Sequence, residues 1–433
     1  MDKQQGDRLF WIWLSQCLGE GSRWYPYLLE RFITPFDIYK ADEEELTELM
    51  PQMSGRLRQA LCNKSLDKAY EILEFCRKGG CSLLCYGDAE YPLSLKALED
   101  PPLVLYYRGV LPDFQNRLCV SVVGTRKMSE YGKRTAYKIA YEMAHAGAVI
   151  ISGMALGIDS IAAGGALESG GQTVAVLGCG IDVAYPPQHA TFKSTLEQRG
   201  AVITEYAPGA RPLGFHFPMR NRIISGLSQA TLVIDADERS GALITADLAL
   251  SQGRAVYAVP ANVGAPNSTG TNRLIRDGAR VALCADDVLK DFSLLYRHSI
   301  DTAKTASLGA ASNFNAEALA RLGVRLSTVD EGPRPPSAPR RPTRKATGQT
   351  AAVQSEQPKQ SVTPCPPDAS AAALEGLSER ERKVFEHIPM DAPVGIDRLQ
   401  GLGYGTGELL TALSMLEICG LVQMLPGGLY ARA

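Results

Sequence analysis

Short apolar runs alternate with longer amphipathic segments through the middle of the chain. Seven of the runs are predicted to be buried strands, because each holds six or seven mostly aliphatic residues and ends near Gly, Pro or a polar residue. They cover residues 118–124, 148–153, 172–178, 201–206, 231–236, 254–260 and 280–285. Helical segments lie between several of them, including residues 131–147, 190–200 and 241–253. The alternation predicts an extended Rossmann-like, doubly wound and mainly parallel α/β sheet.

Both ends of the chain follow a different pattern. Residues 1–95 show helical periodicity broken by Gly and Pro, which predicts a small helical domain of the SAM or helix-hairpin-helix kind. Residues 374–433 predict three helices and a Pro-Gly-Gly turn between two extended runs, which is the order of a winged helix. The third of these helices, residues 406–420, contains no Lys or Arg. We therefore expect it to contact protein or serve a structural role rather than to read DNA.

The α/β core is expected to span residues 96–295, and a linker to span residues 296–373. Nine of the 26 prolines and no Phe, Tyr or Trp fall between residues 331 and 373. Such a composition cannot bury enough apolar surface to offset the entropy of ordering, so the linker is predicted to be disordered. Its basic stretch, residues 339–345, fits a solvated tether better than a contact with a polyanion.

Small and polar residues follow one predicted strand after another. Gly124, Thr125 and Arg126 follow the first strand, Ser152 and Gly153 end the second, and Ser240 and Gly241 open a helix after the fifth. Ligands of open parallel sheets bind outside the carboxyl ends of the strands, so these residues should share one edge. Backbone N–H groups, hydroxyls and helix N-termini there would bind phosphate, and an arginine would donate hydrogen bonds to two of its oxygens.

A second cationic cluster lies at residues 215–226, at the start of a predicted helix. Arg220, Asn221 and Arg222 follow Phe217 there. Arginine beside an aromatic ring suits a groove for single-stranded nucleic acid, since the charge meets the backbone and the ring stacks on a base. Taken singly, each of these motifs also has a structural explanation, such as a tight turn or an ion pair. Their convergence on one sheet edge favours the functional one.

Composition and absent motifs narrow the function. The chain has 433 residues and a formal net charge of −2, so a nucleic-acid surface would have to be local. It has no GxxxxGK[ST] loop, no GxGxxG after the first strand, and no HExxH or EF-hand spacing. Only five histidines occur, and no Ser–His–Asp set stands at a strand end. We expect no catalytic residues, no metal and no cofactor, and hence a protein that is not an enzyme.

The ten cysteines are scattered, and no CxxC pair occurs. Disulfide frameworks belong to small secreted chains, so buried free thiols are expected. No apolar stretch approaches the roughly 20 residues that a membrane helix needs, and the apolar run near the N-terminus is too short for a signal peptide. We therefore expect a cytoplasmic protein without a membrane partner.

Six motifs in order resemble the DprA/Smf family of DNA-processing proteins. They are VVGTRKMSEYG, SGMALGIDSIAAGGAL, TVAVLGCGIDVAYPP, FPMRNRIISGLSQATLVIDADERSGALITADLAL, RAVYAVPA and GTNRLIRDGA. The resemblance is dense from about Pro101 to Asp287, and the two end domains match accessory domains common in that family. Three positions depart from the family's pattern, namely Ala163, His189 and Ala261.

The resemblance implies a fold that binds single-stranded DNA rather than a dinucleotide. It implies a part in natural transformation and recombination, in which the protein protects incoming DNA and loads the RecA recombinase onto it. It also implies a homodimer of the core and no enzymatic activity. The family's phosphate-binding positions map onto the strand-end residues above, onto Arg220 and Asn221, and onto Thr245.

A nucleotide or phosphoribosyl hydrolase on a similar sheet is the alternative hypothesis. The cytokinin-activating "lonely guy" family, a distant resemblance, carries PGGxGTxxE at its sheet edge. Here PGG occurs only at residues 426–428, in the terminal domain, with no GT or Glu after it. This absence favours the DNA-binding hypothesis.

Overall fold

The computed structural model describes residues 3–326 and 379–389, and parts of the chain from 394 to 432. In that last stretch the described residues are 394, 395, 399, 404, 409, 412, 413, 416, 421–425 and 429–432. The chain forms two compact units, Met1–Pro342 and Thr343–Ala433. No helix in the described ranges is long and apolar enough to cross a membrane.

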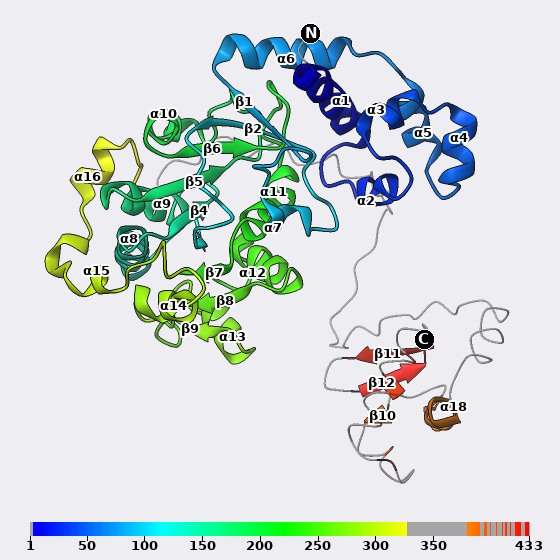
Figure 1. Ribbon diagram of the computed structural model, residues 1–433. Coiled ribbons are helices and arrows are strands. Elements are labelled where there is room, and N and C mark those ends of the chain that lie inside the picture. The colour runs from blue at the N-terminus through cyan, green and yellow to red at the C-terminus, as the bar shows by residue number, and fades with distance from the viewer. Residues whose placement is uncertain are drawn as a thin grey trace, which may run out of the picture. The chain divides into compact units, whose positions relative to one another are not determined.

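A nine-stranded sheet forms the centre of the first unit (Figure 1). Its strands are β1 (Ser82–Cys85), β2 (Val104–Gly109), β3 (Cys119–Val123), β4 (Val149–Ser152), β5 (Gln172–Val176), β6 (Ala201–Thr204), β7 (Ala230–Val233), β8 (Ala255–Ala258) and β9 (Arg280–Val281). They lie in the order β1-β2-β6-β5-β4-β3-β7-β8-β9. The seven from β3 to β9 pair in parallel, whereas β1 and β2 add an antiparallel edge. The predicted doubly wound sheet is confirmed.

The central strands are mostly apolar because both faces of the sheet are covered. In β4, Ile150 belongs to one hydrophobic core, whereas Val149 and Ile151 belong to a second core on the other face. Successive side chains of a strand point to opposite faces, so a strand between two helical layers needs an apolar residue at every position.

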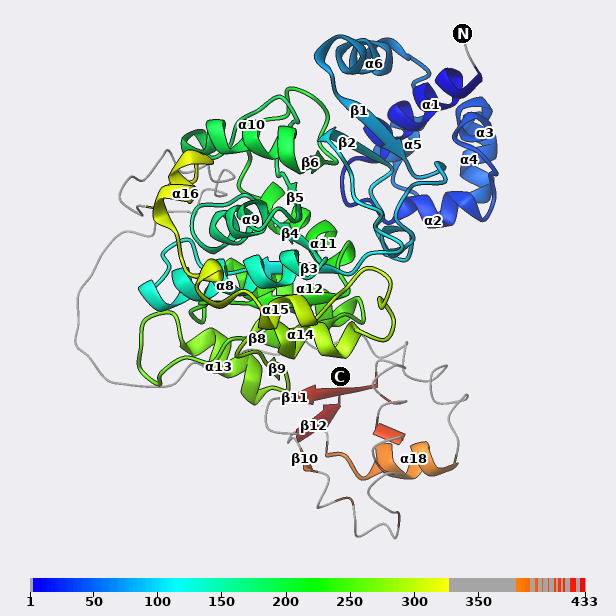
Figure 2. The same cartoon turned by 60° about the vertical axis from the view of Figure 1, so that its left-hand side comes forward.

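Helices cover the sheet on both faces (Figure 2). The layer that forms the first core with the sheet contains α8 (Glu130–His145), α9 (Ile158–Glu168), α10 (Ala190–Arg199) and α14 (Ala285–Phe292). The opposite layer contains α7 (Leu93–Lys96), α11 (His216–Gly226) and α12 (Gly241–Ser251), and α13 (Thr269–Arg276) packs against β8. A short 3-10 helix, η1 (Pro187–His189), precedes α10.

The N-terminal helices form the predicted helical block. They are α1 (Lys3–Leu18), α2 (Trp24–Leu29), α3 (Pro35–Lys40), α4 (Glu43–Leu49), α5 (Gly55–Cys62) and α6 (Asp67–Gly79). Side-chain caps start three of them: Thr34 for α3, Asp42 for α4 and Ser54 for α5. The block ends earlier than the expected residue 95, because β1 already belongs to the sheet.

The expected linker also begins too early. Residues 296–326 form a strap that contains α15 (Ala303–Ala306), the 3-10 helix η2 (Gly309–Ser312) and α16 (Ala316–Arg321), and it packs on α8 and α9. The Phe314 ring meets that of Tyr137 with centroids 5.6 Å apart, and Leu319 is fully buried. Fifteen of its 31 residues are apolar, so its composition is that of a folded segment. The remainder of the predicted linker, residues 327–373, lies outside the described residues.

The second unit carries the predicted terminal hairpin. Strands β11 (Val422–Leu425) and β12 (Leu429–Arg432) pair antiparallel, and β10 (Val394–Gly395) pairs with β12. The described helix α18 (Glu379–Glu386) lies within the first predicted helix, and Leu409, Leu413 and Leu416 of the third are buried in one core with it. These elements are those of a winged helix.

The strap generates a prediction about chain length. A chain ending at Leu326 should keep the full stability of the first unit, whereas one ending at Leu295 should lose on the order of 3 kcal/mol, because the apolar surfaces of α8 and α9 become exposed. Urea unfolding of the two chains measures the difference. Equal free energies of unfolding would show that the strap adds nothing.

Candidate nucleic-acid interface

The strand order of the sheet reverses between β3 and β7. Strands β4, β5 and β6 extend to one side of this pair, and β8 and β9 to the other. The helix after β3 packs on one face of the sheet and the helix after β7 on the opposite face. The two connections diverge and leave a crevice outside the carboxyl ends of the strands, where sheets of this class bind ligands.

A pocket of about 510 Å³ opens at this point. Nine of the twelve residues expected from the sequence line it: Gly124, Thr125, Arg126, Phe217, Arg220, Asn221, Ser240, Gly241 and Thr245. Lys127, Asp159, Asp237 and Asn267 also line it, and these four were not expected. The structure therefore assembles one site from residues that are more than 100 positions apart in the sequence.

The loop after β3 is held by main-chain contacts. Thr125 N donates to Asp235 O at 2.8 Å, and Asp235 Oδ2 accepts from Ser129 N at 2.6 Å. Gly124 has no room for a side chain, since a Cβ there would lie 2.6 Å from Ile158 Cγ1. These contacts fix the backbone of the loop and present Arg126 at the pocket.

Arg220 is buried beneath the pocket, with 5% of its surface exposed. Its Nη1 donates to Gly153 O at 2.9 Å and to Val176 O, and its Nε donates to Asn221 Oδ1 at 3.2 Å. Burial lowers the pKa of this guanidinium, the nearby charge of Asp159 opposes the shift, and Arg126 adds to it. No residue in the described ranges forms an ion pair with Arg220. Its hydrogen-bond partners in the described residues are thus neutral oxygens, and the charge of Asp159 acts on it from beyond ion-pair distance.

Two guanidinium groups approach one aromatic ring at the pocket. Arg126 Cζ lies 5.9 Å and Arg220 Cζ 6.0 Å from the centroid of the Phe217 ring. The Tyr185 ring lies 5.2 Å from the same ring, centroid to centroid. Phe217 is half-buried, whereas Arg126 is exposed. The pocket thus places a ring surface next to two cationic groups.

The first turn of α12 closes the far wall of the pocket. Ser240 is its N-cap residue, and Ser240 Oγ accepts from Ala242 N at 3.4 Å. Nothing lies within 4 Å of the position a Cβ would take at Gly241, so a ligand can approach the backbone there. The helix dipole and the open approach to the backbone at Gly241 favour an anion.

Three expected residues do not line the pocket. Ser152 is fully buried and its Oγ donates to Val122 O at 2.8 Å. Gly153 lies beneath Arg220, to which it offers its carbonyl oxygen. Both support the site from within the sheet. Arg222 points away from it.

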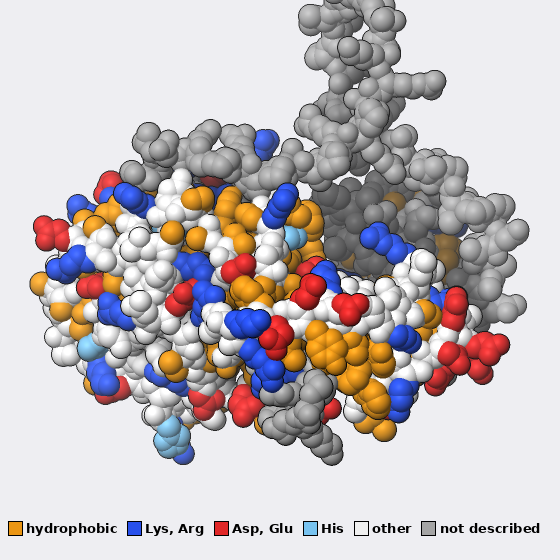
Figure 3. All heavy atoms as spheres, turned by 90° about the horizontal axis from the view of Figure 1, so that it is seen from above, with side chains coloured by type: hydrophobic (Ala, Val, Ile, Leu, Met, Phe, Trp, Pro, Cys, Tyr) orange, Lys and Arg blue, Asp and Glu red, His pale blue; other side chains and the backbone are white. Residues whose placement is uncertain are grey.

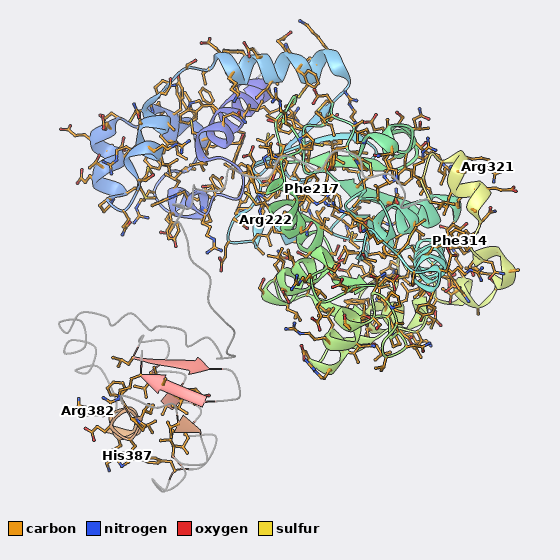
Figure 4. All side chains as sticks on the ribbon, turned by 180° about the vertical axis from the view of Figure 1, so that it is seen from behind. Phe217, Arg222, Phe314, Arg321, Arg382 and His387 are labelled. Carbon is orange, nitrogen blue, oxygen red and sulfur yellow. The ribbon has the colours of Figure 1, made fainter. Side chains whose placement is uncertain are left out.

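Arg222 belongs to a buried ion cluster on the other side of α11. Arg222 Nη2 contacts Glu205 Oε2 at 2.5 Å, and Arg222 Nε lies 3.2 Å from Asp100 Oδ2. Burial raises the pKa values of both carboxyls, while the Arg222 charge opposes that shift. Its own pKa is raised, because the two carboxylates outweigh the effect of burial. Figure 4 labels Arg222 and Phe217 on this one helix.

The sequence held a signal that separates these residues. Phe217, Arg220, Asn221 and Ile224 all line the pocket and follow the i, i+3, i+4, i+7 spacing of one helix face. Arg222 is about 200° around the helix from Arg220. The helical period would therefore have excluded it.

Within the described residues, no three His, Cys, Asp or Glu side chains gather so that they could hold a metal ion. The pocket contains arginines, hydroxyls, amides and one ring, together with the carboxyls of Asp159 and Asp237. The fold and the site together define an α/β protein of the doubly wound class with a polar crevice outside the carboxyl ends of its strands.

Comparison with known proteins identifies the family within that class. The family described as "DNA recombination-mediator protein A" matches residues 82–293, and the "DprA winged helix domain" matches residues 367–428. The chain belongs to the DprA/Smf family of DNA-processing proteins.

Relatives and a solved structure agree with this assignment. The chain is 39% identical over 254 residues to "DNA processing protein DprA" of Streptococcus pneumoniae, covering 58% of this chain and 88% of that one. It is 30% identical over 437 residues to "Protein Smf" of Synechocystis, covering 98% and 99%. The X-ray structure of DNA processing protein A from Streptococcus pneumoniae superposes with a TM-score of 0.58 at 32% identity, covering 65% of this chain and 97% of that one.

The ion cluster generates a prediction that separates Arg222 from the pocket. Arg222→Ala should lower the free energy of unfolding by about 3–5 kcal/mol, because two buried carboxyls lose their counter-charge. Arg126→Ala, at an exposed position, should change it by less than about 0.5 kcal/mol. Chemical denaturation measures both. A stable Arg222 variant would mean that Glu205 and Asp100 accept protons or water without cost.

Proposed function

We propose that this protein binds single-stranded DNA in the pocket between β3 and α12. The observation that carries this proposal is the burial of Arg220 without an ion pair in the described part of the chain. A buried cation whose hydrogen bonds go only to carbonyl and amide oxygens is stabilised further by an anion. A backbone phosphate in the pocket would supply that charge next to Arg126 and the first turn of α12.

The aromatic ring supports a single strand over a duplex. Bases of a single strand have free faces, and stacking on a side-chain ring contributes about 1–3 kcal/mol per base. Phe217 offers such a ring beside the two arginines. In a duplex the base faces are covered by neighbouring bases. The proposed contacts are thus backbone charge and stacking, which give little sequence preference.

The positive charge for this contact is local. The chain has a formal net charge of −2, and on the face shown in Figure 3 basic and acidic side chains are interspersed. Attraction for DNA therefore has to come from a small group of cations. Arg126, Lys127 and Arg220 at the pocket form such a group.

We expect tighter binding to an oligonucleotide single strand than to a blunt duplex, with affinity that falls steeply as salt rises, because condensed counterions are released. Arg126→Ala should weaken binding about tenfold to a hundredfold, which corresponds to the loss of a charge-assisted contact. Phe217→Ala should weaken it by about 1–3 kcal/mol. Fluorescence anisotropy across a salt series measures these effects.

The matched control is Arg321→Ala. Arg321 lies on α16, away from Phe217 in Figure 4, and it is exposed. Arg321→Ala removes one positive charge, as Arg126→Ala does. An equal loss of affinity in the two variants would mean that binding depends on the net charge of the protein and not on the pocket. Equal or tighter binding to duplex would contradict the single-strand proposal. Release of free base from nucleoside monophosphates would favour the hydrolase hypothesis instead.

We propose that the protein acts as a homodimer through the late α/β core, within residues 241–253 and 270–289. Large apolar side chains are exposed there: Ile244 at 42%, Leu250 at 57%, Val281 at 44% and Leu283 at 71%. Strand β9 is the edge of the sheet and pairs only with β8 in the described residues. Exposed apolar residues next to an open strand edge are features of an interface between copies.

Light scattering at micromolar concentration should give twice the monomer mass for the full chain. A Val281→Glu, Leu283→Glu double variant should give the monomer mass, because both side chains are exposed at the edge of the sheet and would place charges in the contact. Val263→Glu is the control, since Val263 is 97% exposed and lies outside the proposed interface. A monomeric parent protein would refute the dimer.

We also propose that the bound strand is handed to the RecA recombinase in recombination and DNA uptake. Membership of a family described as recombination mediators supports this. The measurement is the rate at which RecA assembles on an oligonucleotide that this protein has already bound. No gain in that rate over the bare oligonucleotide would count against the proposal.

A further inference from the structure

Two cysteines meet at the turn that joins the N-terminal helices to the sheet. Cys76 lies in the last turn of α6, and Cys81 lies just before β1. Gly80 between them takes the left-handed conformation, with φ 64° and ψ 29°. Cys81 N then donates to Cys76 O at 3.3 Å. In this type of helix C-terminus, the residue after the left-handed glycine lies next to the residue five positions before it, here Cys81 next to Cys76.

The backbone bond from Cys81 N to Cys76 O holds the two residues side by side just below the surface. The Cys81 thiol donates to Ser82 O at 3.5 Å. The residues are 4% and 7% exposed, but the turn residues 77–80 and Ser82 are exposed. Cys85, on the same strand β1, is 0% exposed. A small reagent has only the turn to pass before it reaches the pair.

A cation is anchored at the same turn. Arg108 on β2 donates from Nη2 to Gly79 O at 3.1 Å, and its Nη1 lies 3.6 Å from Glu197 Oε1. The neighbouring Cys76 thiol lowers the pKa of the Cys81 thiol, burial opposes this, and the Arg108 charge lowers it further. Burial raises the pKa of the Cys85 thiol to about 12. Cys81 is thus better suited than Cys85 to react as a thiolate.

We propose that Cys76 and Cys81 form a reversible oxidation site, a dithiol that hydrogen peroxide converts to a disulfide. The Cys81 thiolate attacks one peroxide oxygen, the O–O bond breaks, and the departing hydroxide takes up a proton to form water. Cys81 is then a sulfenic acid. The Cys76 sulfur attacks the Cys81 sulfur, the S–O bond breaks, and hydroxide leaves with the Cys76 proton as a second water. Both sulfurs are oxidised and the peroxide oxygens are reduced.

The position gives the disulfide a structural effect. The bond would tie the last turn of α6 to the residue just before β1, and so fix the connection between the helical block and the sheet. The proposed oxidation site is separate from the proposed DNA-binding site, because no residue of the pocket between β3 and α12 takes part.

The test uses the full-length protein and trypsin. Arg77 and Lys78 lie between the two cysteines, so digestion separates them into peptides 69–77 and 79–96. After exposure to hydrogen peroxide and alkylation in denaturant, these peptides should appear joined, with about 2 Da less than the sum of the reduced pair. Dithiothreitol should restore both free thiols completely.

Three variants assign the bond. Peptide 79–96 also contains Cys85, so Cys85→Ser is the matched control and should keep the joined peptides. Cys81→Ser should lose them completely. Cys76→Ser should instead leave Cys81 as a sulfenic acid that dimedone traps. Absence of the joined peptides from the oxidised parent protein, or their survival in Cys81→Ser, would overturn the proposal, and the first of these outcomes does not depend on how any variant folds.

Discussion

The geometry of the candidate interface depends on the burial of one guanidinium group. Arg220 reaches under the carboxyl ends of two neighbouring strands and is held there by Gly153 O and Val176 O. Carbonyl oxygens carry only partial charge, so they orient the group without cancelling it. A carboxylate at ion-pair distance would hold Arg220 more firmly but would compete with a phosphate. The site therefore keeps its positive charge available at the expense of some stability, as functional sites often do.

The glycines around Arg220 follow from this constraint. At Gly153, a Cβ would lie 2.5 Å from Arg220 Nη2 and 2.7 Å from Asp159 Oδ2. Gly153 N also donates to Asp159 Oδ2 at 3.1 Å. The residue after β4 must thus be the smallest one, since its backbone contacts the arginine and the aspartate at once. A small residue at a strand end here reflects close packing around a charge, as well as freedom of the backbone.

The sequence predicted the parallel strands and most of the residues that line the pocket. It did not predict the two antiparallel edge strands, the strap or the orientation of Arg222. Strands buried on both faces are mostly apolar, so β3 to β8 stand out. Strand β1 begins at an exposed residue, and the last three residues of β2 are not buried, so both patterns are weaker. The strap was grouped with the proline-rich residues that follow it, although it is as apolar as the whole chain. Arg222 was misassigned because adjacency in sequence says nothing about which side of a helix a residue faces.

Helix α11 carries two unrelated tasks within six residues. Phe217 and Arg220 face the pocket, whereas Arg222 neutralises buried carboxyls behind it. Genetic alleles in this short stretch should therefore fall into two phenotypic kinds. Changes on the pocket face would leave normal amounts of an inactive protein in the cell. Changes at Arg222 would instead deplete the protein, because quality-control proteases remove chains that spend more time unfolded. A loss-of-function screen over α11 can be interpreted only alongside a measurement of abundance.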